Sequence, residues 1–317
     1  MNDFPEIPPA PVPPEQPAID APKVEPAILN PANEPPIVAA VEASSEVLAV
    51  ETLASQQNAY FEKFPEDLRA RWGWFDLFLF LLASVALYMV AALILVLAFL
   101  AVRISPAQIQ HSPRALAVFA VVSTLLVSAG QFGFMYARAR TISREPFWNA
   151  MGWKSFRELG LSPRRVVLRC IVGGFALALL VGVVSSKVGE KAGIPMEQFF
   201  QDWRSALLLM VFGVTVAPLV EETIFRGFIY PVAARSLGIT GGIILTGTLF
   251  GGLHAMQLWG AWPQIALLVM VGIVFTWVRA RTRTVLASYL LHVSYNSYLF
   301  AAFLFATHGL RDLPKIH

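Results

Sequence analysis

Long apolar runs separated by short polar loops are the dominant pattern of this chain. A helix needs about 20 predominantly apolar residues to cross a bilayer, and each run is close to or above that length. The pattern therefore predicts an all-α, polytopic transmembrane helix bundle of about seven to eight spans. The predicted spans lie near residues 75–102, 115–137, 166–186, 205–229, 240–258, 264–280 and 284–306.

Two further features of the runs agree with a membrane bundle. The run at 240–258 contains Gly242, Gly247 and Gly251, whose missing side chains allow close helix packing. Aromatic residues that commonly mark the membrane–water interface stand at the ends of several runs. They are Trp72, Trp74, Tyr136, Trp203, Trp259 and Trp277.

Composition places the chain in the same class. Hydrophobic residues make up 56% of the 317 residues, charged residues make up only 14%, and the mean hydropathy is +0.60. The hydrophobic content and mean hydropathy lie well above those of an ordinary soluble domain, and the charged content lies below it, which predicts a multi-pass integral membrane protein. The single cysteine, Cys170, excludes an intramolecular disulfide.

The first 60 residues differ in composition from the rest of the chain. Twelve of the 22 prolines lie before residue 37, accompanied mainly by Ala and Glu. Such a segment cannot bury enough apolar surface to offset the entropy lost on ordering. We therefore expect a disordered Pro-, Glu- and Ala-rich tail, and it lacks the basic and apolar regions of a signal peptide.

Charge is divided unevenly along the chain and predicts an orientation. Residues 1–51 carry nine acidic side chains and one lysine, a net charge of −8, and because the whole chain carries +3 the remainder carries +11. A basic membrane body is expected beside anionic lipid, and nucleic acid is not an expected partner. With seven spans, the side of the membrane that holds the N-terminus receives fourteen Lys and Arg residues and the other side receives seven, which predicts a cytoplasmic N-terminus. The basic segment 148–165 is predicted to lie along the membrane interface on the cytoplasmic side. The fourteen are Lys63, Arg69, Arg71, Arg138, Arg140, Arg144, Lys154, Arg157, Arg164, Arg165, Arg235, Arg279, Arg281 and Arg283; the seven are Arg103, Arg114, Lys187, Lys191, Arg204, Arg311 and Lys315.

A few strongly polar residues interrupt three of the last four apolar runs. An ionisable side chain at the centre of a membrane costs roughly 2.5–3.5 kcal/mol on the insertion scale and usually marks a functional cavity. Three such residues within six positions are therefore hard to explain as chance. The polar set is Glu221, Glu222, Arg226, His254, His292 and Asn296.

Helical spacing separates the charges of the first group. Glu222 and Arg226 are four residues apart on one helical face, in the favourable order, and are expected to form an ion pair. Glu221 lies about 100° further round the helix and has no such partner within it. The pair is thus expected to be structural, while Glu221 remains available for chemistry.

The remaining polar residues supply groups that hydrolysis of an amide requires. A buried histidine beside a carboxylate can act as a general base on water, and a His–Asn pair can donate hydrogen bonds to an oxyanion. Phe250 shares a face with His254, and His292 shares one with Asn296. A single intramembrane histidine is also common as a packing residue, and a Glu–Arg pair also occurs as a clamp or in a transport site. Catalysis, transport or ion coupling, and a purely structural role all remain open at this point.

Three ordered motifs carry a resemblance to a known family. The sequence contains "EETIFR" at 221–226, "FGGLH" at 250–254 and "HVSYN" at 292–296, with Gly227 after the arginine. This set resembles the E-E-x-x-x-R, F-x-x-x-H and H-x-x-x-N motifs of the type II CAAX prenyl endopeptidases and bacteriocin-processing enzymes, the CPBP or ABI family. The resemblance covers about residues 160–306.

The resemblance implies intramembrane proteolysis by an α-helical bundle. It assigns activation of the attacking water to Glu221 and His254, and stabilisation of the oxyanion to His292 and Asn296. The supporting residues are Glu222, Arg226 and Phe250. The implied partners are the lipid bilayer and a membrane-protein or lipidated-peptide substrate. A non-proteolytic membrane scaffold or immunity protein and a transporter are the alternatives.

Metal dependence is left open by these residues. Glu221, His254 and His292 can ligate Zn²⁺ with water in the fourth position, or they can work without metal as a base and an oxyanion donor. The cofactor is therefore either none or Zn²⁺. The spacing differs from the single-helix H-E-x-x-H arrangement, which favours the metal-free alternative.

The predicted domain organisation follows from these assignments. Residues 1–60 form the tail, and residues 61–160 contain the first two spans and the basic interfacial loop. Residues 161–306 form the protease-like core, and residues 307–317 form a short C-terminal tail.

Overall fold

The structure is a computed structural model that describes residues 47–49, 51–52, 55–56, 59–70, 72–143, 145–188 and 200–313. The chain divides into two units, residues 1–56 and 57–317. Most of the predicted tail lies outside the described residues, as do Arg71, Arg144, Lys191 and Lys315 of the orientation argument. The second unit contains the helical bundle and the candidate site.

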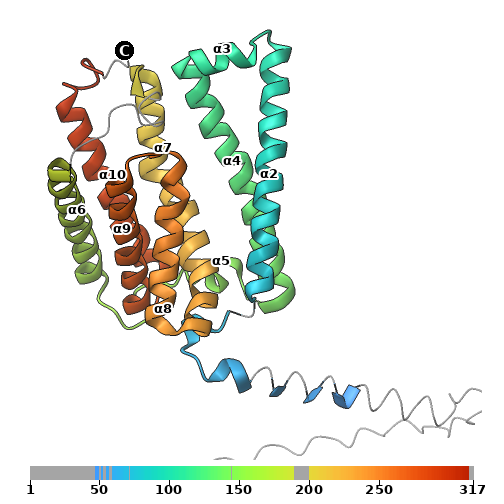
Figure 1. The fold of residues 1–317 in the computed structure, drawn as a ribbon. Helices are drawn as coiled ribbons and strands as arrows, with labels where there is room; N and C mark the ends of the chain where they lie inside the picture. Colours follow the sequence, from blue (N-terminus) through green and yellow to red (C-terminus); the bar gives the residue numbers. More distant parts are fainter. Residues whose placement is uncertain are drawn as a thin grey trace, which may run out of the picture. The chain divides into compact units, whose positions relative to one another are not determined.

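Every regular element in the described residues is helical, as Figure 1 shows. The predicted all-α class is confirmed in this respect. The elements are η2 Glu66–Leu68, α2 Trp74–Ala101, α3 Pro106–His111, α4 Pro113–Arg138, the π-helix η3 Ala139–Ser143, α5 Phe147–Ala150, α6 Pro163–Val188, α7 Trp203–Glu222, the π-helix η5 Thr223–Ile229, α8 Tyr230–Leu253, η6 His254–Met256, α9 Trp262–Thr282 and α10 Val285–Ala306.

Five candidate helices within the described residues are long and apolar enough to cross a membrane. One of them, Trp203–Met256, covers two of the predicted apolar runs, and α10 with its polar residues His292 and Asn296 is not among the five. The helical path within Trp203–Met256 is broken at Gly238, whose φ of 74° is a left-handed conformation that favours glycine. These findings indicate a multi-pass membrane protein, while the count of seven to eight spans stays a prediction.

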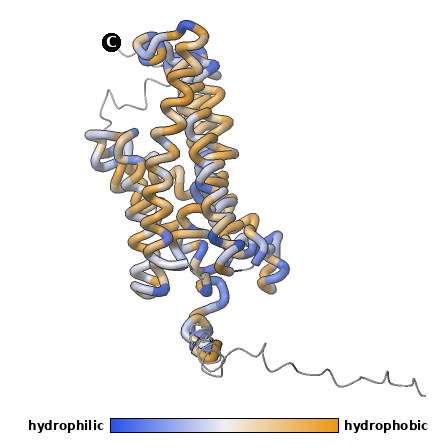
Figure 2. Tube along the Cα trace, turned by 90° about the vertical axis from the view of Figure 1, so that its right-hand side faces the viewer, coloured by the Kyte–Doolittle hydropathy of each residue, from blue (hydrophilic) through white to orange (hydrophobic). Residues whose placement is uncertain are grey.

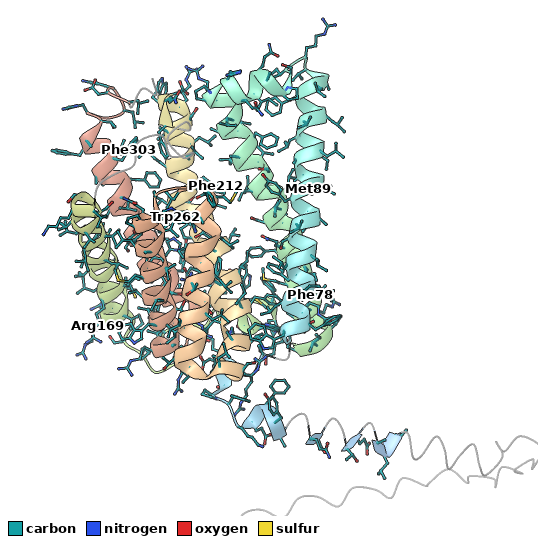
Figure 3. All side chains as sticks on the ribbon, viewed as in Figure 1. Phe78, Met89, Arg169, Phe212, Trp262 and Phe303 are labelled. Carbon is teal, nitrogen blue, oxygen red and sulfur yellow. The ribbon has the colours of Figure 1, made fainter. Side chains whose placement is uncertain are left out.

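The surface of α2 is suited to lipid. Phe78 and Met89, labelled in Figure 3, are 55% and 59% exposed, and Leu81, Val85 and Leu93 are similarly exposed along the same helix. A soluble monomer rarely exposes so large an apolar surface, because contact with water is unfavourable. Figure 2 shows hydrophobic colours along the helices and hydrophilic colours mainly near their ends, as expected for spans.

Polar contacts join α2 to α4 inside the apolar region. Asp76 in the first turn of α2 forms an ion pair with Arg138 at the end of α4, and Gln131 donates a hydrogen bond to the Ser84 hydroxyl at 2.9 Å. Each contact pairs polar groups that are at least partly buried, and the two helices lie side by side (Figure 1).

Close glycine contacts hold α8 against α9, which confirms the tight packing predicted for this segment. A Cβ atom at Gly247 would lie 2.5 Å from the backbone nitrogen of Ile273, and one at Gly251 would lie 2.5 Å from that of Val269. Side chains larger than hydrogen would therefore force the two helices apart.

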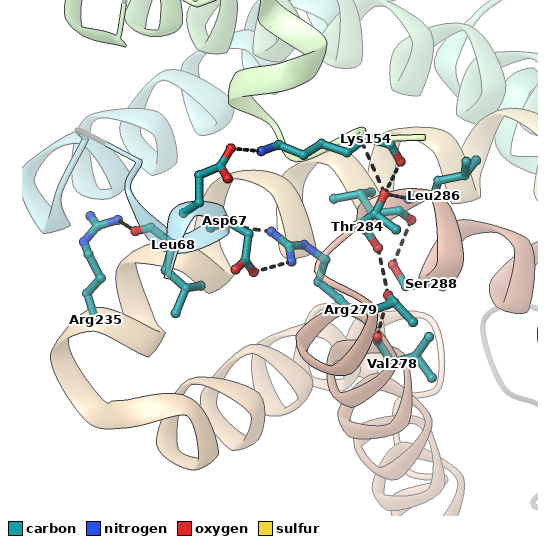
Figure 4. A network of polar contacts seen from close by, with 12 residues as sticks. Asp67, Leu68, Lys154, Arg235, Val278, Arg279, Thr284, Leu286 and Ser288 are labelled. Carbon is teal, nitrogen blue, oxygen red and sulfur yellow. Dashed lines mark hydrogen bonds and ion pairs between the residues drawn. The ribbon is translucent and has the colours of Figure 1, made fainter. Parts of the chain in front are cut away.

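The η2 segment binds several helix ends together at the basic end of the bundle (Figure 4). Arg279 of α9 donates to the Asp67 carboxylate at 2.8 Å, and Arg235 of α8 donates to the Leu68 carbonyl at 2.8 Å. Lys154 pairs with Glu66 and so lowers the pKa of that carboxyl. Residues from distant parts of the sequence that were predicted to share one side of the membrane thus meet at one end.

A further ion pair ties α4 to α7 near their N-terminal ends. Arg114 donates two hydrogen bonds, at 2.9 and 3.0 Å, to Asp202, which caps α7 by accepting from the Ser205 amide. The bond from Arg114 lowers the pKa of Asp202 to about 2. The carboxylate therefore stays charged at neutral pH and can both cap the helix and pair with Arg114.

Trp72 corrects one expectation from the sequence. It was predicted to be an interface residue, but it is only 1% exposed, stacks on Phe228 and donates its indole hydrogen to the Phe228 carbonyl at 2.8 Å. By contrast, the predicted interface residues Trp74, Tyr136, Trp203, Trp259 and Trp277 are 46–59% exposed. Trp72 precedes α2 and packs inward, so an apolar aromatic residue near a helix end is not by itself a sign of the interface.

We predict opposite effects of alanine at two adjacent glycines of α8. Gly251→Ala places a methyl group 2.5 Å from the Val269 backbone and should destabilise the protein by about 1–3 kcal/mol. Gly252→Ala meets no atom within 4 Å and should be neutral or stabilising, because alanine is the better helix former. Melting temperatures of both variants in detergent test this, and equal losses at the two positions would contradict the packing described.

Candidate active site

The predicted ion pair between Glu222 and Arg226 is present and completely buried. Arg226 Nη1 lies 2.9 Å from Glu222 Oε1, and neither side chain is exposed. Glu222 ends α7 and Arg226 lies in the π-helix η5, so the pair bridges a change in helix type. Local π-helical turns occur frequently at functional sites.

The remaining donors of Arg226 bind α9. Its Nε donates to the Thr276 hydroxyl at 3.2 Å, and its Nη2 donates to the Gly272 carbonyl at 2.9 Å. The guanidinium also lies 4.6 Å from the centre of the Phe250 ring. Hydrogen bonds and ring contacts thus replace the water that a buried cation has lost.

His292 of α10 lies between two carboxylates. Its Nδ1 is 3.0 Å from Glu222 Oε1, and its Nε2 is 3.7 Å from Glu221 Oε2. The carboxylate of Glu222 can only accept, so Nδ1 carries a hydrogen and donates it. The ring also packs 4.6 Å from the ring of Phe275. These contacts fix the orientation of the imidazole and direct Nε2 toward Glu221.

Glu221 is the accessible member of the adjacent carboxylates. Its side chain is 26% exposed, whereas that of Glu222 is completely buried. The two neighbours therefore have different environments, as their helical spacing predicted.

His254 begins the short η6 helix directly after α8. Its Nδ1 lies 2.8 Å from the Phe250 carbonyl oxygen, which can only accept, so this nitrogen carries the hydrogen of the neutral ring. The neutral tautomer leaves the lone pair on Nε2 to accept a proton. Phe250 therefore orients His254 through its backbone, in addition to packing its ring beside Arg226 and His292.

Asn296 has a contact that its sequence position did not reveal. Its side-chain amide donates to the Gly213 carbonyl of α7 at 2.7 Å and so connects α10 to α7. One amide hydrogen is engaged in this bond, and the second remains for another acceptor.

A single cavity of about 620 Å³ collects five of the seven predicted site residues. Glu222 and Arg226 are not part of its wall and support it from the buried side. The rest of the wall is mainly apolar and comes largely from α4, α7, α9 and α10; it includes Phe212 and Phe303, both labelled in Figure 3. The five predicted residues in the wall are Glu221, Phe250, His254, His292 and Asn296.

Several residues of the site were missed from the sequence. Gly272, Phe275 and Thr276 of α9 contact Arg226 or His292, and Tyr295 lines the cavity beside Asn296. Gly272, Phe275 and Thr276 lie outside the three motifs, and Tyr295 lies in the third motif between its histidine and its asparagine. Glycine, threonine and aromatic residues are ordinary in membrane helices. Thr276 therefore offered no signal in the sequence, because α9 contains none of the three motifs.

The three residues that could ligate Zn²⁺, Glu221, His254 and His292, all line the cavity. Among the residues that the structure describes, no group of three or more His, Cys, Asp or Glu side chains is placed to hold a metal ion. Nδ1 of His292 faces Glu222 and Nδ1 of His254 faces a backbone carbonyl. The chemistry proposed below is that of the side chains.

Comparison with known proteins identifies this part of the chain. Residues 203–298 match the family model described as Type II CAAX prenyl endopeptidase Rce1-like. No match was found among curated proteins or among solved structures. The matched part contains all three motifs, which confirms the predicted resemblance over these residues, and such a domain suggests an intramembrane protease.

We expect the Arg226→Ala variant to fold poorly. It leaves Glu222 buried without its cation, and breaking a buried pair in this way costs about 3–5 kcal/mol. Arg169→Ala is the matched control, because Arg169 is exposed on α6 and its loss should change stability by less than about 0.5 kcal/mol. Yield of monodisperse protein and melting temperature measure both effects. Equal stability of the two variants would refute the structural role of the pair.

Proposed function

We propose that residues 203–298, as a domain of the Rce1-like type II CAAX prenyl endopeptidase family, hydrolyse a peptide bond near the membrane face of a substrate. The observation that carries this proposal is the shared cavity, whose wall contains Glu221, His254, His292 and Asn296 from three helical segments. A carboxylate, two histidines and an amide around one apolar cavity are the groups that water-mediated amide hydrolysis needs.

In the proposed reaction, Glu221 and His254 activate a water molecule. The water oxygen bonds to the carbonyl carbon of the substrate while its proton passes to Nε2 of His254, the ring nitrogen that the Phe250 contact leaves unprotonated. When the C–N bond breaks, the same nitrogen returns the proton to the leaving amine. Glu221 holds the water by accepting its other hydrogen.

His292 and Asn296 are proposed to stabilise the oxyanion. For this role His292 needs hydrogens on both ring nitrogens, Nδ1 for Glu222 and Nε2 for the oxyanion. In that state the positive charges of His292 and Arg226 balance the negative charges of Glu221 and Glu222. Asn296 contributes the amide hydrogen that does not bind Gly213.

The membrane arrangement is part of the same proposal. We propose about seven to eight spans with a cytoplasmic N-terminus, which places the η2 segment and its basic partners on the cytoplasmic side. α10 begins at Val285 on this cytoplasmic side, and His292 lies seven residues, or about 10 Å, further along the helix. This depth supports cleavage close to the cytoplasmic membrane face.

The apolar walls of the cavity support a membrane-protein or lipidated-peptide substrate. Phenylalanine side chains from α7, α9 and α10 line it, including Phe212, Phe275 and Phe300. They offer apolar surface to a substrate segment that is itself soluble in the bilayer.

Replacing the proposed base should remove catalysis without unfolding the protein. Glu221→Gln and His254→Gln should each lower kcat by about 10²- to 10⁴-fold, since a positioned general base contributes that much. Glu158→Gln, at an exposed position outside the cavity, should leave the rate unchanged. The assay is membrane proteomics of cells that express each variant, followed by cleavage of an identified substrate with purified protein. A full set of products from Glu221→Gln would contradict the mechanism and favour a non-proteolytic scaffold.

A further inference from the structure

α9 contains none of the three motifs, yet its buried face contacts both the site and the η2 segment. Gly272, Thr276 and Arg279 are all buried and are spaced four and three residues apart, which places them on one side of the helix. The first two bind Arg226, and the third binds Asp67. One helical face therefore connects the basic end of the bundle with the interior of the site.

Thr276 connects α9 to the charged cluster. Its hydroxyl accepts from Arg226 Nε at 3.2 Å and donates to the Gly272 carbonyl at 2.8 Å. The same carbonyl accepts from Arg226 Nη2, so both contacts set the plane of the guanidinium. Nη1 of that guanidinium then holds Glu222, and Glu222 holds Nδ1 of His292. The orientation of His292 thus depends on a hydroxyl that does not reach the cavity.

Arg279 fixes the other end of this helical face. Its side chain is 1% exposed, and it donates to the Asp67 carboxylate at 2.8 Å and to the Asp67 carbonyl at 3.2 Å (Figure 4). The guanidinium also lies 5.7 Å from the centre of the Tyr230 ring at the start of α8. Losing the Asp67 carboxylate would leave Arg279 buried and without its anion, so this end of α9 would have to adjust its position to relieve the unpaired charge.

We infer that α9 is a positioning helix for the catalytic cluster, with Thr276 and the Asp67–Arg279 pair as its two points of attachment. Thr276 orients Arg226, Glu222 and, through them, His292, while Asp67 keeps α9 in the register that this contact requires. These residues act through others and do not touch the substrate. The inference rests on the proposed proteolytic function, and it adds that the segment before α2 regulates the geometry of the site.

Isosteric substitution at Thr276 tests the first point of attachment. Thr276→Val removes the hydroxyl at almost constant volume and should lower kcat by about 10- to 100-fold with KM unchanged, because a small displacement of a catalytic group has effects of this size. Thr276→Ser keeps the hydroxyl and should restore most of the rate. Thr246→Val is the matched control: Thr246 is equally buried, its hydroxyl has no hydrogen-bond partner, and the rate should not change. Equal rates for Thr276→Val and wild type would overturn the inference.

Two adjacent carboxylates test the second point of attachment. Asp67→Asn should lower kcat by about 2- to 30-fold, the range expected for a coupled residue outside the site, with KM unchanged. Glu66→Gln removes a charge from the same segment. Because the Glu66 side chain is largely exposed, losing its ion pair with Lys154 should have a negligible effect on kcat. Equal effects of the two substitutions, or none from Asp67→Asn, would contradict the role given to α9.

A spectroscopic readout separates this inference from the proposed function. In ¹⁵N-histidine-labelled protein, the signal missing from His292→Gln is that of His292, and its Nδ1–H chemical shift reports the bond to Glu222. Thr276→Val and Asp67→Asn should both shift that signal, whereas Thr246→Val and Glu66→Gln should not. A shift in a protein that cleaves no substrate would support the positioning and refute the proteolytic function. An unchanged signal in a protein that does cleave substrate would refute the positioning and support the proteolytic function.

Discussion

The buried ion pair of Glu222 and Arg226 is the constraint on which the rest of the site depends. A guanidinium without exposure to solvent is stable only if its donors and its charge are compensated within the protein. Here Glu222 supplies the charge, Thr276 and Gly272 of α9 supply acceptors, and Phe250 supplies a ring face. Because these partners come from several helices, satisfying one cation requires a particular register of α7, α8 and α9 relative to one another.

This register also determines what the cavity presents to a substrate. Glu222 uses the same oxygen, Oε1, for Arg226 and for His292, so the ion pair extends to α10 and orients the imidazole. Glu221 precedes Glu222 by one position on the helix and therefore faces the cavity. Its carboxylate lies 3.7 Å from Nε2 of His292. Polar groups that are expensive to bury are thus arranged as one connected network, in which the buried members hold the exposed ones.

The sequence predicted what depends on local spacing and apolar length. The helices, the Glu222–Arg226 pair at four-residue separation and the close packing of the glycines in α8 all follow from periodicity along one segment. Contacts between segments could not be predicted in this way: Asn296 binds the Gly213 carbonyl, and Asp67 binds Arg279 across 212 positions. Trp72 was assigned to the interface for the same reason, since only the packing of the π-helix η5 against it shows that Phe228 accepts its indole hydrogen.

The central claim is that side chains of the cavity activate water directly. Purified protein, treated with a chelator and checked by elemental analysis, can be incubated with a cleaved substrate in water enriched in ¹⁸O. Mass spectrometry then reads the new C-terminal carboxylate of the product. The account predicts cleavage at the untreated rate by metal-free protein, with one ¹⁸O atom incorporated from solvent. Stoichiometric zinc in the purified protein, whose removal abolishes cleavage and whose return restores it, would contradict the account.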